Sequence, residues 1–523
     1  MASLLKFVKD SPNLVGQFKT FQEGKDFFSA MLHPDSPFNH TYRLVGNEDL
    51  MNDLDSFLDG DSCLGLLYGA GGTGKSRILW ALCERREGKR PRLLFLSERM
   101  EATAERLKEL PSDSVCVVVD DAHRLASLSD MVRVLFGGGK PNRTIKILLT
   151  SRPYASESID YSLRCLPEGS VTRFRELTVL DRKTTALALA KQVLPNVGTD
   201  TQELLVKASD GNPLIITVGG SLIRSGGIDP RLLSQRTEFR SRALQGLLSG
   251  LPDKLDGDVN ALKLLECIAG IGPIHPADQE TVESLSSFLH CTPSSLWRSL
   301  DQLERHHSLL LRRGRTLRVQ PDVLSDHLLF KASVVNGQST GFVREVFDHF
   351  RGSCLSRLLT NATELEWRCQ LEGQNINVLG DAWRIIERQL PDMSHTQRLH
   401  VLDVLKEPSW FAPQQVWRIV RWILDHPDAL PDSNEFLRKI GLCHKDVLYR
   451  IPGLLAHIAW RREHTAECAA LLWRMAADDD RRPNAHPECP MRVLQDILSY
   501  DPRKSLDTQL EALKGLEMEL ANE

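Results

Sequence analysis

Residues 63–86 read CLGLLYGAGGTGKSRILWALCERR, and this stretch decides the fold class. A short apolar run is followed by the glycine-rich segment 69–76 and then by apolar residues at helical spacing. Gly-x-x-x-x-Gly-Lys-Ser between a buried strand and a helix is the P-loop pattern. Its glycines let backbone N–H groups turn around a phosphate, and the helix N-terminus favours negative charge there. The sequence therefore predicts a phosphate-binding loop on a parallel α/β sheet.

The side chains of this loop have distinct expected roles. The Lys75 ammonium would reach the terminal phosphates of a nucleotide, and the Ser76 hydroxyl would coordinate Mg²⁺. The backbone of the remaining positions would surround the phosphates. The expected nucleotide-binding residues of the loop are Gly69, Ala70, Gly71, Gly72, Thr73, Gly74, Lys75, Ser76 and Arg77.

A second apolar run, VCVVV at 115–119, ends in Asp120 and Asp121. Such a run is typical of a parallel strand buried on both faces, whose carboxyl end would lie beside the phosphates. Asp120 is expected to hold Mg²⁺ through a water molecule. Asp121 is placed either to polarise the attacking water or to play a structural role, and the sequence leaves both roles open.

A third apolar run, IKILL at 145–149, delivers the segment TSRP at 150–153 to the same edge of the predicted sheet. A guanidinium at that edge is within reach of a terminal phosphate, so Arg152 is a candidate γ-phosphate sensor. Together with Lys75, Asp120 and Asp121 it completes the set of candidate catalytic residues.

Four motifs, in this order and spacing, resemble those of the STAND ATPases, signal-transducing relatives of the AAA+ proteins that include NACHT and apoptotic-ATPase modules. They are GAGGTGKS at 69–76, VVVDDAH at 117–123, LLTSRP at 148–153 and GNPL at 211–214. The resemblance implies an ADP-held resting form and an ATP-held oligomeric active form. It also implies that Pro213 packs near the adenine and that Val45, in the segment 44–46, closes over the other side. Pro213 has a second explanation, because proline is favoured at the first position of a helix.

The chain is long enough for roughly three to four domains. The expected fold is an α/β P-loop NTPase with a doubly wound parallel sheet, followed by a helical lid, a winged helix and an α-helical, repeat-like domain. We expect a short helical adaptor or partner-binding segment at 1–40, the P-loop domain at 41–168, the lid at 169–250, the winged helix at 251–335 and a helical sensor domain at 336–523.

The predicted winged helix has two interpretations. Its hairpin, SLLLRRGRTLRVQP at 308–321, has four arginines that could contact DNA phosphates. However, Asp301 and Glu304 on the preceding helix would repel a polyanion. In the family that the chain resembles, this domain is usually an intramolecular latch, and a histidine near the position of His327 can read the ADP β-phosphate. The order Asp326-His327 departs from the family's usual Met-His-Asp, and a histidine packed on a helix is the competing explanation. The four arginines are Arg312, Arg313, Arg315 and Arg318.

Composition excludes several classes of protein. Lys and Arg number 65 against 69 Asp and Glu, a net charge of -4, which supplies no global reason to coat nucleic acid or anionic lipid. The 11 cysteines contain no Cys-x-x-Cys pair, so reduced thiols are expected. No apolar run approaches the roughly 18 residues of a membrane span. We therefore expect a cytoplasmic protein without a membrane partner.

The sequence thus favours an ATP-dependent signal-transduction switch, with ATP or ADP and Mg²⁺ as cofactors. Slow hydrolysis would control homo-oligomerisation and the activation of a separate effector, because the segment 1–40 is too short for a catalytic domain. Family analogy alone suggests antiphage defence and an unidentified protein or nucleic-acid trigger. The alternatives are a nucleotide-regulated, winged-helix transcription regulator and an ATPase chaperone or scaffold subunit.

Overall fold

The computed structural model describes residues 20–32, 41–97, 104–125, 127–136, 145–164, 166–248, 250–313, 315–432, 434–478, 488–499 and 506–521. The chain divides into two compact units, Met1–Leu328 and Leu329–Glu523. Most of the expected N-terminal adaptor segment, at 1–19 and 33–40, lies outside the described residues.

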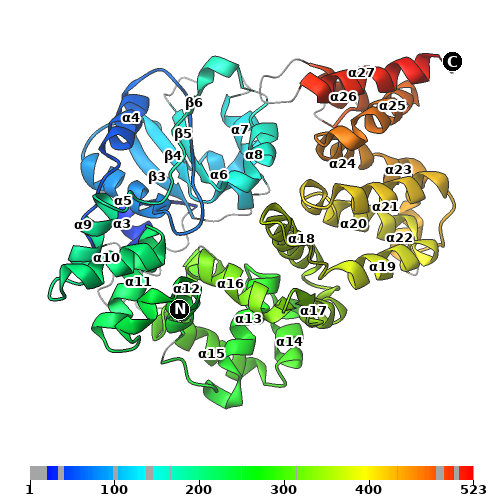
Figure 1. Ribbon diagram of the computed structural model, residues 1–523. Helices are drawn as coiled ribbons and strands as arrows, with labels where there is room; N and C mark the ends of the chain where they lie inside the picture. The colour runs from blue at the N-terminus through cyan, green and yellow to red at the C-terminus, as the bar shows by residue number, and fades with distance from the viewer. Residues whose placement is uncertain are drawn as a thin grey trace, which may run out of the picture. The chain divides into compact units, whose positions relative to one another are not determined.

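The first unit contains a six-stranded sheet in the order β1-β3-β4-β5-β2-β6 (Figure 1). All neighbouring strands are parallel except the edge pair β1–β3, which is antiparallel. The P-loop strand β2 therefore lies beside β5, which in turn pairs with β4, and the carboxyl ends of these three strands meet at one edge. The strands are β1 (Phe21–Glu23), β2 (Leu64–Tyr68), β3 (Arg92–Leu96), β4 (Val115–Val119), β5 (Ile145–Ser151) and β6 (Val171–Arg173).

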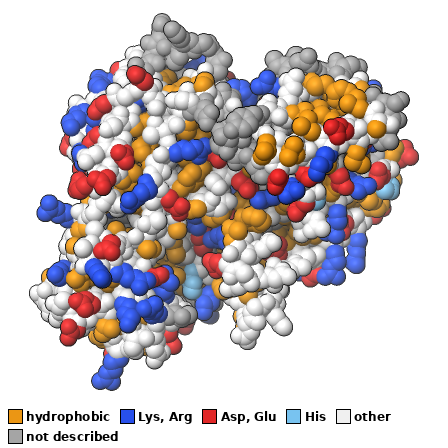
Figure 2. Space-filling model, turned by 45° about the horizontal axis from the view of Figure 1, so that its top comes forward, with side chains coloured by type: hydrophobic (Ala, Val, Ile, Leu, Met, Phe, Trp, Pro, Cys, Tyr) orange, Lys and Arg blue, Asp and Glu red, His pale blue; other side chains and the backbone are white. Residues whose placement is uncertain are grey.

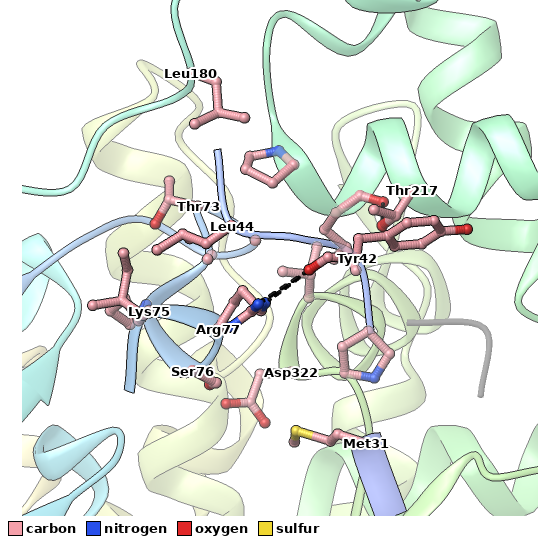
Figure 3. A pocket seen from close by; sticks show the side chains of 18 of the residues that line it. Met31, Tyr42, Leu44, Thr73, Lys75, Ser76, Arg77, Leu180, Thr217 and Asp322 are labelled. Atoms are coloured by element: carbon pink, nitrogen blue, oxygen red, sulfur yellow. Dashed lines mark hydrogen bonds between the residues drawn. The ribbon is translucent and has the colours of Figure 1, made fainter. Parts of the chain in front are cut away.

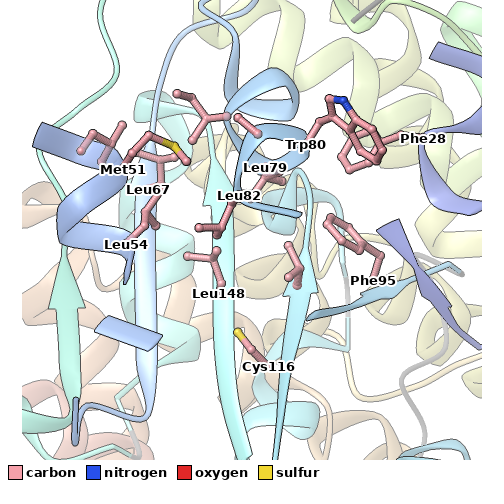
Figure 4. Close-up of a cluster of buried hydrophobic side chains, with 14 of the residues drawn as sticks. Phe28, Met51, Leu54, Leu67, Leu79, Trp80, Leu82, Phe95, Cys116 and Leu148 are labelled. Atoms are coloured by element: carbon pink, nitrogen blue, oxygen red, sulfur yellow. The ribbon is translucent and has the colours of Figure 1, made fainter. Parts of the chain in front are cut away.

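Alternate residues of the central strands fill two cores, one on each face of the sheet. Cys116 and Val118 of β4 pack with Leu79 and Leu82 of the P-loop helix α5 (Lys75–Arg85), as Figure 4 shows in part. The intervening β4 valines pack on the opposite face, against α7 (Leu128–Phe136) and α8 (Ser156–Ser162). Successive side chains of a strand point to opposite faces, so a continuous apolar run suits a sheet covered by helices on both sides. The predicted α/β layer structure is confirmed.

Four helices, here called the lid because they lie in the segment expected to form it, follow the sheet and enclose a core of their own. Leu205, Ile216 and Phe239 lie in this core and are almost fully buried. The helices are α9 (Thr185–Val193), α10 (Thr199–Ser209), α11 (Pro213–Arg224) and α12 (Arg236–Gly246).

Three further helices and a hairpin complete the first unit. The third helix begins as expected, because the Thr292 hydroxyl accepts a hydrogen bond from Ser295 N at 3.2 Å and Pro293 is the first helical residue. The hairpin leads through Gln320 and Pro321 into α16 (Asp322–Ser333). The preceding elements are α13 (Ala261–Ile271), α14 (Gln279–Phe288), α15 (Pro293–Arg305), β7 (Leu310–Arg313) and β8 (Thr316–Val319).

Within the residues described for the second unit, the only strands are those of the short hairpin β9 (Val334–Val335) and β10 (Gln338–Ser339), and the other regular elements are helices. Several of its helices bury one face; in α21 the buried side chains recur with a helical period at Val416, Ile419, Val420 and Ile423. In the described parts of the chain, no helix combines the length and apolarity needed to cross a membrane. The helices are α17 (Phe342–Phe350), α18 (Leu355–Leu371), α19 (Gly380–Gln389), α20 (His395–Val404), α21 (Pro413–Asp425), α22 (Glu435–Ile440), α23 (His444–Leu448), α24 (Ile451–Ile458), α25 (Arg462–Asp478), α26 (Pro490–Leu498) and α27 (Leu506–Leu520).

Candidate nucleotide-binding site

The P-loop turns sharply between β2 and α5. Gly72 has φ +78° at the third position of a turn closed by Thr73 N donating to Ala70 O at 3.4 Å, and Gly74 has φ +99° at the start of the helix. Both positions need the left-handed backbone that glycine adopts without strain. A Cβ on Gly72 would also lie 2.8 Å from Asn212 Oδ1. The glycine pattern is therefore a requirement of the fold of the loop.

Lys75 and Ser76 occupy the first turn of α5 and point toward the sheet edge. Lys75 is buried, and its ammonium donates to Gly69 O at 2.8 Å and to Ala70 O at 3.2 Å. Burial lowers the pKa of Lys75, and the carboxyl group of Asp121 partly opposes that effect. The ammonium is thus held at the base of the loop.

The three predicted motifs meet at Asp120. Val119 pairs with Leu149 in the sheet, which brings the end of β4 beside Thr150. Asp120 accepts a hydrogen bond on each carboxylate oxygen, from Ser76 Oγ at 2.9 Å and from Thr150 Oγ1 at 2.7 Å. Thr150 also accepts a bond from Asp121 N at 3.0 Å. One hydroxyl from each neighbouring motif therefore orients this carboxylate.

Ser76 and Asp120 form a pair of oxygen donors that fits Mg²⁺. Among the described residues, no three His, Cys, Asp or Glu side chains converge to hold a metal on their own. Mg²⁺ commonly takes one or two protein groups and fills its remaining positions with phosphate oxygens and water, so this donor set is sufficient beside a nucleotide.

A pocket opens over the P-loop (Figure 3). It is lined by the loop from Gly71 to Ile78, by Asp121 and Arg152, and by residues from the segment before α4 (Glu48–Asp59) and from the lid. Val45 and Pro213 are both among the lining residues. Gly69, Ala70 and Asp120 lie outside the lining set, behind Lys75 and Ser76.

Arg77 also lines the pocket, and its guanidinium binds the backbone of the segment before α4. Nε and Nη2 donate to Tyr42 O at 3.2 and 3.1 Å, as the dashed line in Figure 3 indicates. The Arg43 backbone exchanges two further bonds with Gln192 of the lid helix α9. The segment that includes Val45 is therefore tied to both the P-loop helix and the lid.

Arg152 is brought to the site but is already engaged by two carboxylates. Its Nη1 lies 2.5 Å from Asp326 Oδ2, and its Nη2 lies 3.9 Å from Asp322 Oδ2. Arg318 Nη1 lies 2.9 Å from Asp322 Oδ1, and Arg124 Nη1 lies 3.4 Å from the same oxygen. The beginning of α16 thus places two acids among three arginines beside the phosphate end of the pocket.

Asp121 joins this cluster, with its Oδ2 3.7 Å from Arg318 Nη1. Burial and the neighbouring Asp322 and Asp120 raise the pKa of Asp121 well above its ordinary value. Burial would raise the pKa of Asp322 too, but Arg124, Arg318 and a hydrogen bond with Asp121 hold it well below the ordinary value. The pKa values of these two neighbouring carboxyl groups are therefore shifted in opposite directions, Asp121 upward and Asp322 downward.

Sequence reasoning singled out His327 in this region and missed the role of its neighbours. The pocket is lined by Asp322 and Val323, and Arg152 is bonded to Asp326, whereas His327 lies outside the lining set. The sequence did contain a signal for the role of these neighbours. Asp322 and Asp326 are four residues apart at the start of a helix, and this spacing places them on one face.

Two of the four hairpin arginines are paired with acids of this chain. Arg312 donates to Glu304 on α15 at 2.8 and 2.5 Å, and Arg318 is buried beside Asp322. The side chain of Arg313 and the turn at Gly314 lie outside the described residues. Glu304, which was expected to disfavour a polyanion, neutralises an arginine of the hairpin.

No protein-family model matches the chain, and no curated protein matches it. Solved structures to which it is similar include a Walker-type ATPase of Pyrococcus abyssi, at 18% identity over 55% of this chain and 96% of that one, with TM-score 0.29. A STAND protein with a tetratricopeptide repeat sensor from Pyrococcus horikoshii is 13% identical over 91% and 77%, with TM-score 0.33. The Thermotoga maritima RuvB Holliday junction branch migration motor is 17% identical over 53% and 93%, with TM-score 0.25. These values are low, so the assignment of the site rests on its own geometry, which is that of a P-loop at the carboxyl edge of a parallel α/β sheet.

Proposed function

We propose that this chain is an ATP-dependent switch of the STAND type, in which Arg152 exchanges internal carboxylates for a nucleotide phosphate. The carrying observation is the pairing of Arg152 with Asp326 and Asp322 at the phosphate end of the pocket. A sensor arginine that is paired within the chain can report a phosphate only if that pairing breaks. The charged cluster would therefore have two states, one with Arg152 paired to the carboxylates and one with Arg152 paired to a phosphate.

The nucleotide would be held by the groups that line or support the pocket. The P-loop backbone and Lys75 would bind the phosphates, and Val45 and Pro213 would contact the base. Ser76 and Asp120 would hold Mg²⁺, which supplies positive charge to the terminal phosphates when bound. Asp121, which lines the phosphate end of the pocket, would polarise the attacking water.

The described arrangement suits a nucleoside diphosphate better than a triphosphate. The Asp322 and Asp326 carboxylates would repel a γ-phosphate and compete with it for Arg152. A charged hydrogen bond contributes about 1.5–3 kcal/mol, whereas shifting a population from about 1:99 to 99:1 takes about 5.5 kcal/mol. Arg152 alone is therefore insufficient, and the other cluster residues or a partner must supply the remainder.

The consequences outside this site follow from the same proposal. ATP would drive homo-oligomerisation, and 336–523 would sense a protein or nucleic-acid trigger as a repeat-like domain. The elements from α13 to β8 would act as a winged-helix latch. Output would come from a separate cytoplasmic effector, with antiphage defence as the family-based context.

A winged-helix transcription regulator is the weaker candidate. Two of its hairpin arginines, Arg312 and Arg318, are engaged with acids of this chain. On the face drawn in Figure 2, Lys and Arg side chains lie among Asp and Glu side chains. A DNA reader would need these cations available for phosphates.

The proposal is tested with Lys75→Ala, which removes the cation of the P-loop. Calorimetry should show ADP and ATP binding in the wild type and neither in the variant. Lys191→Ala, at an exposed position of α9, is the matched control and should bind as the wild type does. Light scattering should then show a larger assembly with ATP than with ADP. If Lys75→Ala binds nucleotide as tightly as the wild type, the proposed nucleotide site is wrong. If the assembly has the same size with ATP and with ADP, the proposed switch is wrong.

A further inference from the structure

The P-loop and the lid are joined directly by the side chain of Asn212. Its Oδ1 accepts hydrogen bonds from Leu214 N at 3.0 Å and Ile215 N at 3.3 Å, which caps the N-terminus of α11. Its Nδ2 points the other way and donates to Gly71 O at 3.2 Å. The amide orientation is unambiguous, because the oxygen faces two donors and the nitrogen faces a carbonyl.

A second bond runs beside the first. Leu214 N also donates to Gly72 O, at 3.2 Å, so the lid holds two consecutive carbonyls of the P-loop. The close approach requires Gly72, since a Cβ there would lie 2.8 Å from Asn212 Oδ1. The beginning of α11 is therefore fitted against the outside of the loop.

Holding these carbonyls determines where the adjacent N–H groups point. In a planar trans peptide the C=O and N–H are directed to opposite sides. Fixing Gly71 O and Gly72 O from outside thus turns the N–H groups of Gly72 and Thr73 toward the inside of the loop. Thr73 N shows this orientation, because it donates across the loop to Ala70 O. Inward N–H groups are the donors with which such a loop binds phosphate.

We propose that Asn212 is a positioning residue, which uses its amide nitrogen to orient the P-loop for the β-phosphate and couples that orientation to the lid. The inference rests on the proposed nucleotide site. It assigns a function to the middle residue of Gly-Asn-Pro that is separate from helix capping and from any contact of Pro213 with the base.

The two roles of Asn212 are separable by substitution. Asn212→Ser keeps a capping oxygen and removes the amide NH₂ group that reaches Gly71 O, and its hydroxyl is on a shorter side chain. Asn212→Asp keeps the cap but turns a carboxylate toward that carbonyl and the bound phosphates. Asn260→Ser is the matched control. Asn260 caps α13 by accepting from Lys263 N at 2.8 Å, and it lies outside the pocket lining.

Calorimetry with ADP, and competition by adenosine, gives the decisive comparison. Asn212→Ser should weaken ADP binding by about threefold to tenfold, the usual worth of one neutral hydrogen bond, and Asn212→Asp by more than about tenfold. Adenosine binding should be unchanged in both variants, and Asn260→Ser should leave both ligands unaffected. The melting temperature without ligand should stay near that of wild type in Asn212→Ser.

Two outcomes would overturn the inference. If Asn212→Ser binds ADP as tightly as wild type, the amide nitrogen does not position the loop. If adenosine binding weakens by the same factor as ADP binding, Asn212 acts through the packing of the lid. If the proposed nucleotide site itself is wrong, the wild type will bind ADP no better than Lys75→Ala does. That result is distinct from both outcomes above.

Discussion

Arg152 and Asp326 lie 174 residues apart in the sequence, yet their side chains form a hydrogen-bonded ion pair at the carboxyl edge of the sheet. Arg152 is almost fully buried, so its charge cannot be left unpaired without a large cost. Any γ-phosphate that reaches Arg152 must therefore replace a carboxylate rather than water. If the pocket binds nucleotide as proposed, its preference between ADP and ATP depends on α16 as well as on the P-loop.

Replacing both acids by Asp322→Asn and Asp326→Asn should increase the affinity for ATP relative to ADP by at least about tenfold, the lower end for a charged hydrogen bond. The amides still accept a bond from Arg152 but no longer repel a γ-phosphate. Calorimetry with each nucleotide measures the ratio. Asp348→Asn, at an exposed ion pair of α17, is the control. An unchanged ratio in a folded double variant would exclude competition at Arg152.

Asp121→Asn should slow ATP hydrolysis by about 10²-fold or more, since a general base is lost, while ADP binding changes little. Burial, with Asp322 nearby, raises the pKa of Asp121, and an amide has nearly the same shape as the carboxyl group that it replaces. Phosphate release at saturating ATP is the measurement. Asp130→Asn on the exposed face of α7 should hydrolyse as wild type. If Asp121→Asn hydrolyses ATP at the same rate as Asp130→Asn, the role of Asp121 is structural.

The parts of the site that the sequence predicts well are those with a local pattern. The apolar run 115–119 coincides with β4, and α5 begins at Lys75 as the P-loop motif requires. By contrast β1 has only three residues, two of them polar, and its antiparallel pairing with β3 has no periodic signal. Such a pairing depends on contacts that are distant in the sequence.

The cluster on α16 shows a second limit of sequence reasoning. Asp326 and His327 are adjacent in sequence, so both fell within the expected latch. On a helix, consecutive residues point about 100° apart, whereas residues four apart share a face. Asp322 and Asp326 therefore reach the arginines together. Predicting this needs the docking of α16 on the P-loop, where a Cβ on Gly71 would lie 2.8 Å from Val323.

Combined replacement of Arg312, Arg313 and Arg315 by alanine should leave nucleotide binding and ATP hydrolysis unchanged. Arg312 is paired with Glu304 and lies outside the pocket lining, so the hairpin tip is not needed for the nucleotide site. Anisotropy of labelled DNA duplexes at two salt concentrations should show, at most, weak binding without sequence preference. Arg384→Ala on α19 serves as a control for removing a surface cation. Sequence-selective binding that the triple variant loses would favour the transcription-regulator alternative.

Arg398→Ala should destabilise the second unit by about 3 kcal/mol, because it leaves buried acceptors unsatisfied and a cavity in their place. Arg398 is 1% exposed, and its guanidinium donates to His426 O at 2.6 Å and to Asp428 O at 2.7 Å. The same guanidinium lies 5.1 Å from the centre of the Trp422 ring. Seven of the nine tryptophans belong to the second unit, so tryptophan fluorescence during urea unfolding reports mainly on that unit. Arg384→Ala, whose side chain is 64% exposed, should shift the transition by no more than about 0.5 kcal/mol. ADP binding should persist in Arg398→Ala, since the P-loop belongs to the first unit. An unfolding midpoint equal to that of Arg384→Ala would show that water replaces the guanidinium without cost.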